Sequence, residues 1–229
     1  TKEPMEVGPT AHYVMGGIRV HAETQQTTIS QLYAAGEVAS GLHGANRLGG
    51  NSLSDLVVFG KRAGEFAAKS AIDIEQPKLN DNEINHACKD ILEPLSRKEG
   101  ENPGRIYESL RDMMQNKVGI IRNGSELENA LKELEEFEKR SKTTFVGPSK
   151  VYNSGWHQAL DLKNMIDISK ACTLAALTRT ESRGGHTRED YPVPDKGKWS
   201  HTTNVIWMEN GEVEIRQEEL EQPPTDLEK

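Results

Sequence analysis

The 229-residue sequence has few cysteines, few aromatic residues and no long apolar run. Its two cysteines, Cys88 and Cys172, are far apart and both fall in helical patterns, so we expect reduced, buried thiols rather than a disulfide or a metal site. Two cysteines are also too few to hold an iron–sulfur cluster. The longest apolar runs, such as Leu174–Leu177, are far shorter than the roughly 20 residues that cross a bilayer. Any association with a membrane is therefore expected to be indirect.

The sequence also lacks an excess of positive charge and a targeting signature. The net charge of -8, without a compensating basic stripe, would repel a phosphate backbone and argues against nucleic acid as a partner. The chain begins with Thr1 and shows no signal peptide. We therefore expect that it is cut from a longer chain.

The composition changes along the chain, which predicts a domain boundary near residue 75. Residues 13–59 are rich in Gly and Ala, whereas Glu, Lys and Asn dominate from residue 72 onward. In the first segment, residues 31–35 form a short apolar run that ends at Gly36, which predicts a buried strand delivering Glu37 into a loop. The loop at residues 39–50 is unusually rich in glycine, which suggests close approach of the backbone to another group, such as a ligand.

A helix is predicted to begin after this glycine-rich loop. Ser52 followed by Asp55 fits the Ser-x-x-Asp form of a capping box. Apolar and small residues then recur at helical spacing, which predicts a core helix that packs tightly on a sheet. These residues are Leu53, Leu56, Val57, Gly60, Ala63, Gly64 and Ala67.

Four further helices are predicted near residues 81–98, 103–121, 125–141 and 156–181, separated by glycine and proline. Short connections favour an antiparallel arrangement. The third of these helices has an apolar stripe, and the fourth should be the most buried member of the bundle. The stripe consists of Leu127, Leu131, Leu134 and Phe137, and the apolar face of the fourth helix of Leu162, Met165, Ile166, Cys172 and Ala176.

The tail changes to a period of two residues. Alternation over residues 203–208, followed by Asn210-Gly211 and a second apolar run, predicts a β-hairpin.

Five residues of the first segment could carry chemistry, and each also has a structural interpretation. A lone His12 is more often structural than catalytic, and Glu37 resembles a ribose-binding acid although the usual phosphate-binding glycine motif is absent. Arg47, held between glycines, could bind a carboxylate by two parallel hydrogen bonds, or could form a structural ion pair. Backbone amides at Ser52 and Leu53 could stabilise negative charge, or could belong to an ordinary capped helix.

Taken together, these motifs resemble a known family. The runs PTAHYVMGGI at residues 9–18, LYAAGEVASGLHGANRLGGNSLSDLVVFGKRAG at residues 32–64 and SRGGHTREDYP at residues 182–192, followed by Trp199, are similar to the flavoprotein subunits of succinate dehydrogenase and fumarate reductase. The resemblance implies an α/β remnant of an FAD-binding domain followed by an antiparallel α-helical bundle and a small β-hairpin tail. The corresponding domains are residues 1–75, 76–185 and 186–229.

The resemblance also implies roles for individual residues. His12 of the His-Tyr pair and Arg47 of HGANR would bind a dicarboxylate substrate. Glu37 would bind the FAD ribose, and Ser52 and Leu53 would meet the flavin ring. A helix amino terminus near the pyrimidine side of the flavin should raise its reduction potential, because reduction adds negative charge there.

The implied reaction is the interconversion of succinate and fumarate by hydride transfer to or from FAD. Electrons would pass through an iron–sulfur subunit to a quinone-binding membrane anchor, which would place the protein peripherally on the cytoplasmic face of the inner or plasma membrane. The proton-shuttle Arg, the FAD pyrophosphate motif, the His that often carries FAD and the capping domain would precede Thr1. No catalytic residue and no metal ligand is therefore assigned within this chain, and we expect it to be inactive and unlikely to bind FAD alone.

Three residues of the second match, Arg183, His186 and Arg188, have less definite roles. A structural or subunit-contact role is favoured for His186 and Arg188, and Arg183 is ambiguous in the same way.

Other functions remain open. L-aspartate oxidase shares the HGANR core, although SLSDLVVFG favours the dehydrogenase. The chain could instead be a noncatalytic docking module whose helices and tail bind an iron–sulfur subunit, which exposed apolar surface on the bundle would support. A stand-alone flavin-binding protein is disfavoured, because half of the nucleotide-binding fold would be absent and a strand edge would be exposed.

Overall fold

The computed structural model describes residues 3–5, 8, 11–75, 77–209 and 212–220. The chain divides into two compact units, Thr1–Leu79 and Asn80–Lys229, which we call unit 1 and unit 2. Within the described ranges, no helix combines the length and the hydropathy that a membrane span requires.

Unit 1 contains a short 3-10 helix, η1 (Gly36–Val38), and a long helix, α1 (Asn51–Ile72). The residues before η1 form isolated bridges, including Ile18 with Ala39 and Gln26 with Tyr33. The strand predicted at residues 31–35 is wrong, because this segment makes only the bridge at Tyr33. Gln31 has a φ of 68°, in the left-handed region, which interrupts an extended backbone.

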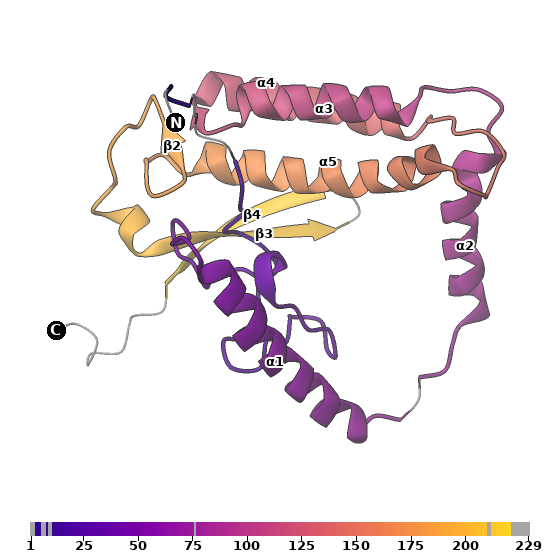
Figure 1. Cartoon of the computed structure of the whole chain (residues 1–229), viewed down its shortest axis with the longest axis horizontal. Helices are drawn as coiled ribbons and strands as arrows, with labels where there is room; N and C mark the ends of the chain where they lie inside the picture. The colour runs from indigo at the N-terminus through magenta and orange to yellow at the C-terminus, as the bar shows by residue number, and fades with distance from the viewer. Residues whose placement is uncertain (1–2, 6–7, 9–10, 76, 210–211, 221–229) are drawn as a thin grey trace. The chain divides into compact units, whose positions relative to one another are not determined.

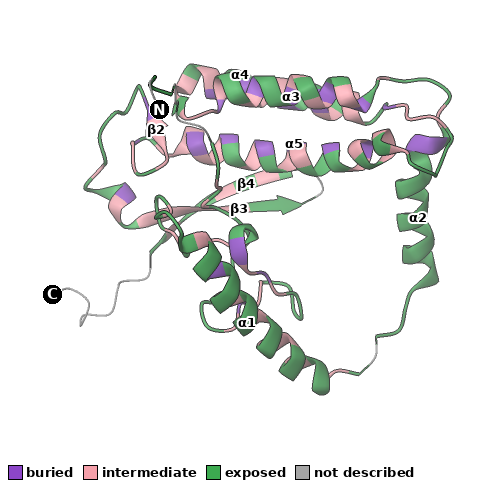
Figure 2. Ribbon diagram, viewed as in Figure 1, coloured by how far each residue is buried: buried purple, intermediate pink, exposed green. Residues whose placement is uncertain are grey.

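Helix α1 begins differently from the sequence prediction. Its N-cap is Gly50 in the left-handed conformation, and no side chain caps the first turn, so the predicted capping box of Ser52 and Asp55 is wrong. The prediction of a core helix is also wrong: Leu53 is 69% and Val57 is 72% exposed. Figure 2 shows α1 exposed along nearly its whole length. Helical spacing identifies residues that share a face, but it does not supply the surface that covers them.

The described part of unit 2 contains four α-helices, each with an asparagine at the N-cap. They are α2 (Asp81–Ser96), α3 (Pro103–Lys117), α4 (Gly124–Ser141) and α5 (Ser154–Thr178). A side-chain oxygen of each capping asparagine accepts a hydrogen bond from a backbone N–H of the first turn, which satisfies one otherwise unpaired donor. The capping residues are Asn80, Asn102, Asn123 and Asn153.

Helices α3, α4 and α5 pack together as a bundle with one hydrophobic core (Figure 1). Glu101, just before α3, pairs with Arg140 near the end of α4, as expected when neighbouring helices run antiparallel. Helix α5 has more buried residues than the other described helices of unit 2, which confirms that it is the most buried member of the bundle. The core includes Ile106, Leu110, Met113, Leu127, Ala130, Leu134, Phe137, Leu162, Ile166 and Ala176.

The prediction of buried thiols is wrong. Both Cys88 and Cys172 are free and exposed. Cys172 shares α5 with the apolar face, but Ser169, Thr173 and Ala176 occupy the buried positions of that turn.

The described part of unit 2 also contains two strands of two residues and two strands of eight residues. Strands β1 (Ile121–Arg122) and β2 (Thr187–Arg188) pair in parallel, and a 3-10 helix, η2 (Lys198–Ser200), precedes the hairpin. Strands β3 (Thr202–Glu209) and β4 (Glu212–Glu219) pair antiparallel, with Glu209 opposite Glu212, so the predicted hairpin is confirmed. Its predicted Asn210-Gly211 turn lies outside the described residues.

Candidate functional site

The candidate site in unit 1 begins with a close backbone approach at Gly17. A Cβ atom added there would lie 2.4 Å from the carbonyl oxygen of Val38, so a larger residue would force the two segments apart. The amide of Ile18 donates to that carbonyl over 2.7 Å, and the amide of Ser40 donates to the Ile18 carbonyl over 2.9 Å. Gly17 therefore lets the segment that carries His12 lie beside η1.

The side chain of Glu37 strengthens this arrangement. Its Oε1 accepts a hydrogen bond from the amide of Val14 over 3.0 Å, although the residue is exposed. Gly36, with a φ of 78°, brings η1 against α1: a Cβ atom there would lie 2.5 Å from Cδ2 of Leu56. The side chain of Glu37 therefore contacts Val14, which follows His12 by two positions in the sequence.

Three polar side chains from different segments meet at the Tyr13 hydroxyl. This hydroxyl donates to Oδ2 of Asp55 over 3.3 Å and lies 3.2 Å from Nε2 of His43. Nε2 of His43 lies 3.5 Å from the same Oδ2 atom. Burial and the Asp55 carboxylate raise the pKa of the Tyr13 phenol, because both disfavour a second negative charge. These groups form a closed triangle of polar contacts.

Arg47 lies over the ring of Tyr13. Its Cζ is 4.6 Å from the ring centre, which is a cation–π distance, and its Nη1 donates to the Leu48 carbonyl over 3.4 Å. Its Nε is buried and has no hydrogen-bond partner among the described residues. Among the residues that the structure describes, no carboxylate forms an ion pair with Arg47. The structural ion pair considered as an alternative is therefore not found in this part of the chain.

The remaining predicted residues lie at accessible positions. His12 is exposed and has no hydrogen bond to another described residue. Ser52 is half-buried and Leu53 is exposed, both in the first turn of α1. No side chain caps that turn, and the amides of Asn51 and Leu53 donate to the Leu48 and Gly50 carbonyls over 3.2 Å each.

The structure brings most of these residues around one short segment. Arg47 stacks on Tyr13, the neighbour of His12, and Glu37 reaches the same segment at Val14. Ser52 and Leu53 lie in the turn of α1 that leads to Asp55.

Sequence reasoning missed the roles of Tyr13, His43 and Asp55. Tyr13 lies in PTAHYVMGGI and His43 begins HGANR, but neither was assigned a role of its own. Asp55 was interpreted as part of a helix cap. A signal was available, because an acidic residue at an otherwise apolar or small position of α1 suggests a buried polar partner.

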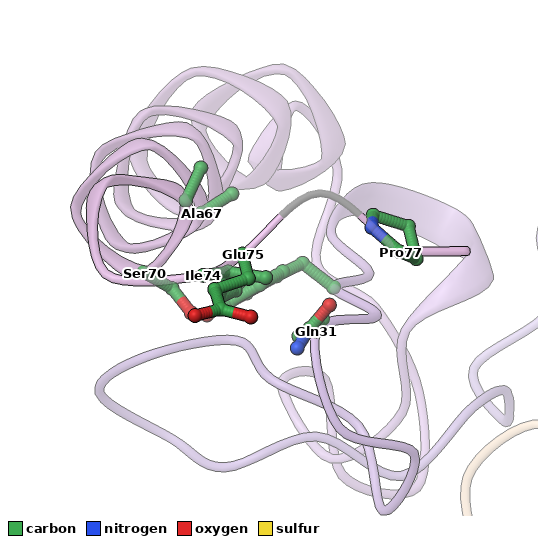
Figure 3. Close-up of a pocket in the computed structure, with 8 residues that line it drawn as sticks. Gln31, Ala67, Ser70, Ile74, Glu75 and Pro77 are labelled. Atoms are coloured by element: carbon green, nitrogen blue, oxygen red, sulfur yellow. The ribbon is translucent and has the colours of Figure 1, made fainter.

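A separate hollow in unit 1 contains none of the predicted site residues (Figure 3). It lies between the end of α1 and the segment at Gln31 and Tyr33, and the Tyr33 hydroxyl donates to the Phe66 carbonyl over 3.5 Å. Its lining consists of Gln31, Tyr33, Ala67, Ser70, Ala71, Ile74, Glu75 and Pro77.

In unit 2, His186 and Arg188 belong to a network of internal contacts. His186 Nδ1 lies 3.0 Å from Nη1 of Arg122, and its Nε2 lies 3.1 Å from the carbonyl oxygen of Arg179. Burial is the main cause of the lowered pKa of His186, and nearby guanidinium groups act in the same direction. Arg183 pairs with the buried Glu181.

Within the described part of the chain, no group of three or more His, Cys, Asp or Glu side chains could hold a metal ion.

Two family models match this chain. The one described as "Fumarate reductase flavoprotein C-term" matches residues 107–228, and the one described as "FAD binding domain" matches residues 1–53. The first match spans more than half of the chain. The chain belongs to the fumarate reductase and succinate dehydrogenase flavoprotein family.

Similar proteins agree with this membership. The fumarate reductase flavoprotein subunit of Haemophilus influenzae is 37% identical over 215 residues, which cover 91% of this chain and 35% of that protein. The succinate dehydrogenase flavoprotein subunit of Coxiella burnetii is 34% identical over 230 residues, which cover 94% of this chain and 38% of that protein. The structure of Mycobacterium smegmatis Sdh1 in complex with UQ1 matches with a TM-score of 0.88 and 44% identity, covering 96% of this chain and 37% of that one.

Membership of this flavoprotein family confirms the fold class: an α/β remnant of an FAD-binding domain, a helical bundle and a small hairpin. The FAD-binding match and the flavoprotein relatives support FAD as the cofactor of the intact subunit. The chain spans little more than a third of the length of these relatives.

Proposed function

We propose that the complete protein interconverts succinate and fumarate, with His12 and Arg47 binding the carboxylates of the substrate. The observation that carries this proposal is the uncommitted charge of Arg47, which rests on an aromatic ring and pairs with no carboxylate of a described residue. A planar guanidinium with free donors suits bidentate binding of a carboxylate. His12, exposed and one residue from Tyr13, can supply a second contact to the same ligand.

Residues of unit 1 also suit the binding of FAD. We assign the FAD ribose to Glu37, whose carboxylate is exposed, and the flavin ring to Ser52 and Leu53. The glycines before α1 leave room for a ring, since a Cβ atom added at Gly49 or Gly50 would meet no atom within 4 Å. The positive end of the α1 dipole would stabilise negative charge on a group bound there.

FAD, when bound, supplies the acceptor or donor of the hydride in this reaction. The role of Arg47 and His12 is then to fix the substrate by its carboxylates, so that the carbon that gives or accepts the hydride stays in one position. We assign no proton-transfer step to residues 1–229. In the complete subunit, we propose that the proton-shuttle Arg lies in the sequence before Thr1.

The domains that we propose are residues 1–75 for the carboxy-terminal part of the FAD-binding domain, 76–185 for the helical bundle and 186–229 for the tail. In the complete protein, electrons would pass through an iron–sulfur subunit to a quinone-binding membrane anchor. The flavoprotein itself would lie peripherally on the cytoplasmic face of the membrane. An exposed apolar face of α2, which includes Ile84 and Ile91, supports docking of a partner protein on unit 2.

A chimera tests the proposed activity. Residues 1–229 replace the matching segment of the Coxiella burnetii succinate dehydrogenase flavoprotein subunit, and succinate oxidation is followed with an artificial electron acceptor. We expect activity in the chimera and its loss in the Arg47→Ala variant. Arg62, which lies 5.3 Å over the ring of Phe59, offers a matched control, and Arg62→Ala should leave the activity unchanged. A flavin-loaded chimera that does not oxidise succinate would contradict the proposal.

Residues 1–229 alone should bind no FAD and catalyse no turnover, because they carry only part of the family's cofactor and substrate site. Titration with FAD, followed by flavin fluorescence, measures this directly. Saturable binding that succinate tightens would show instead that unit 1 is a sufficient site.

A further inference from the structure

Tyr13, His43 and Asp55 form a group of polar contacts in unit 1 in which two of the side chains are buried. His43 and Asp55 have side chains that are only 8% and 4% exposed. Asp55 is the one buried residue of α1 among those that the structure describes. Burying a carboxylate costs free energy unless it is hydrogen-bonded. The buried Asp55 therefore depends on its contacts with Tyr13 and His43.

The polar contacts fix the orientation of the Tyr13 ring. Its hydroxyl meets both Asp55 and His43, and the His43 ring packs edge-on against it, with centroids 5.2 Å apart and an angle of 82° between the planes. A tyrosine held at its hydroxyl and along one edge cannot turn its face away from the glycine-rich loop. That face is the surface on which Arg47 lies.

The orientation of Arg47 depends on this ring more than on hydrogen bonds. Its one hydrogen bond to a described residue, to the Leu48 carbonyl, is long at 3.4 Å, and no described residue pairs with its buried Nε. An aromatic face holds a guanidinium without occupying its N–H donors, whereas a structural carboxylate would occupy them and neutralise the charge. The ring therefore fixes the group and leaves its donors available.

We propose that Tyr13, His43 and Asp55 are positioning residues, which orient the Tyr13 ring so that the Arg47 guanidinium presents free donors to a carboxylate ligand. The ligand part of this inference rests on the proposed function, whereas the orientation of Arg47 does not. The competing interpretation is that the three residues only join α1 to the segment at residues 12–14.

Nuclear magnetic resonance of the 229-residue chain separates these interpretations, with the Arg47 Nε–Hε signal as the probe. In the wild type, the Tyr13 ring current should displace this signal upfield. Tyr13→Leu should abolish the displacement, and Tyr13→Phe, which keeps the ring but loses its anchor, should reduce it by at least half. Asp55→Ala should act like Tyr13→Phe, whereas Asp55→Asn, which keeps an acceptor oxygen, should restore most of it.

Tyr33→Phe is the matched control, because Tyr33 lies in the same unit and its hydroxyl donates to the Phe66 carbonyl rather than to a residue of the candidate site. It should leave the Arg47 signal unchanged. An Arg47 signal that stays at its wild-type position in a folded Tyr13→Phe variant would overturn the positioning role. Tyr13→Phe removes a single oxygen atom, so it decides the question even if Asp55→Ala unfolds unit 1.

Succinate, added to the same samples, tests the ligand separately. If succinate shifts the Arg47 signal in the wild type and binds about tenfold more weakly to Tyr13→Leu, both the positioning role and the carboxylate role hold. If succinate has no effect although the variants move the signal as expected, the positioning role holds and the carboxylate role of Arg47 in the isolated chain fails.

Discussion

Arg188 and Asp190 form a two-point ion pair that joins the ends of two helices. Nε and Nη2 of Arg188 each lie 2.7 Å from an oxygen of Asp190. Nη1 of Arg188 also donates to the Ala176 carbonyl at the end of α5, while Asp190 accepts from the amide of Gly124 at the start of α4. Each charge therefore lies at the helix end of opposite partial charge.

Asp190→Ala should destabilise unit 2 by about 3 kcal/mol, because it leaves the Arg188 guanidinium buried without its counter-charge. Urea unfolding followed by tryptophan fluorescence measures this in unit 2 alone, since all three tryptophans, Trp156, Trp199 and Trp207, lie there. Arg188→Met combined with Asp190→Ala should cost less than the sum of the single changes. Strict additivity would show that the pair is not coupled.

Glu181 predicts how stability depends on pH. Burial alone would raise its pKa, but hydrogen bonds from Arg183, the Asp195 amide and Arg179 outweigh this and lower the pKa to about 2. The folded chain therefore binds this proton less readily than the unfolded chain, whose glutamate has an ordinary pKa near 4.5. Its stabilisation is present above pH 4.5 and is lost as the pH falls toward 2.

The variant Glu181→Gln should consequently be less stable than the wild type at pH 7, with the difference shrinking as the pH falls from 4.5 to 2. Urea unfolding at pH 7, 4 and 3 measures this difference. Glu214→Gln is the control, because Glu214 also pairs with an arginine but lies at an exposed site of β4. A gap between wild type and Glu181→Gln that is constant across this range would contradict the assignment.

The helices of unit 2 could be predicted closely from sequence, because each bears its own signals. The stripe through Leu127, Leu134 and Phe137 has the helical period, and prolines and glycines mark the breaks. The hairpin was equally local, since the alternation over residues 203–208 predicts a strand and the apolar run that follows predicts its partner.

Unit 1 was harder to predict, because its structure depends on contacts between distant residues. The apolar run near Tyr33 has the composition of a strand, but only a neighbouring strand would make it one, and Gln31 adopts a positive φ instead. Asp55 fits a capping box by spacing, yet Tyr13, 42 positions away, is its hydrogen-bond partner. The motifs indicated which segments mattered for the site, but not that an aromatic ring would hold Arg47.

Truncation of the bundle core should show which face of α5 stabilises unit 2. Leu162 is fully buried, so Leu162→Ala should lower the free energy of unfolding by about 3 kcal/mol through lost contacts and a cavity. Ile168, on the same helix, is 61% exposed, and Ile168→Ala should change it by less than about 1 kcal/mol. Urea unfolding monitored by tryptophan fluorescence compares the two, and equal losses would contradict the assignment of the core.

Two adjacent glycines offer a test of how the His12 segment is held against η1. A Cβ atom at Gly17 would lie 2.4 Å from the Val38 carbonyl oxygen, whereas one at Gly16 would meet nothing within 4 Å. Gly17→Ala should therefore break the hydrogen bond from the Ile18 amide, while Gly16→Ala should leave it intact. Hydrogen exchange of the Ile18 amide measures the difference, which we expect to be at least about tenfold, or about 1.4 kcal/mol. Equal protection in the two variants would mean that the backbone can separate there without loss, and that Gly17 is not required for the close approach.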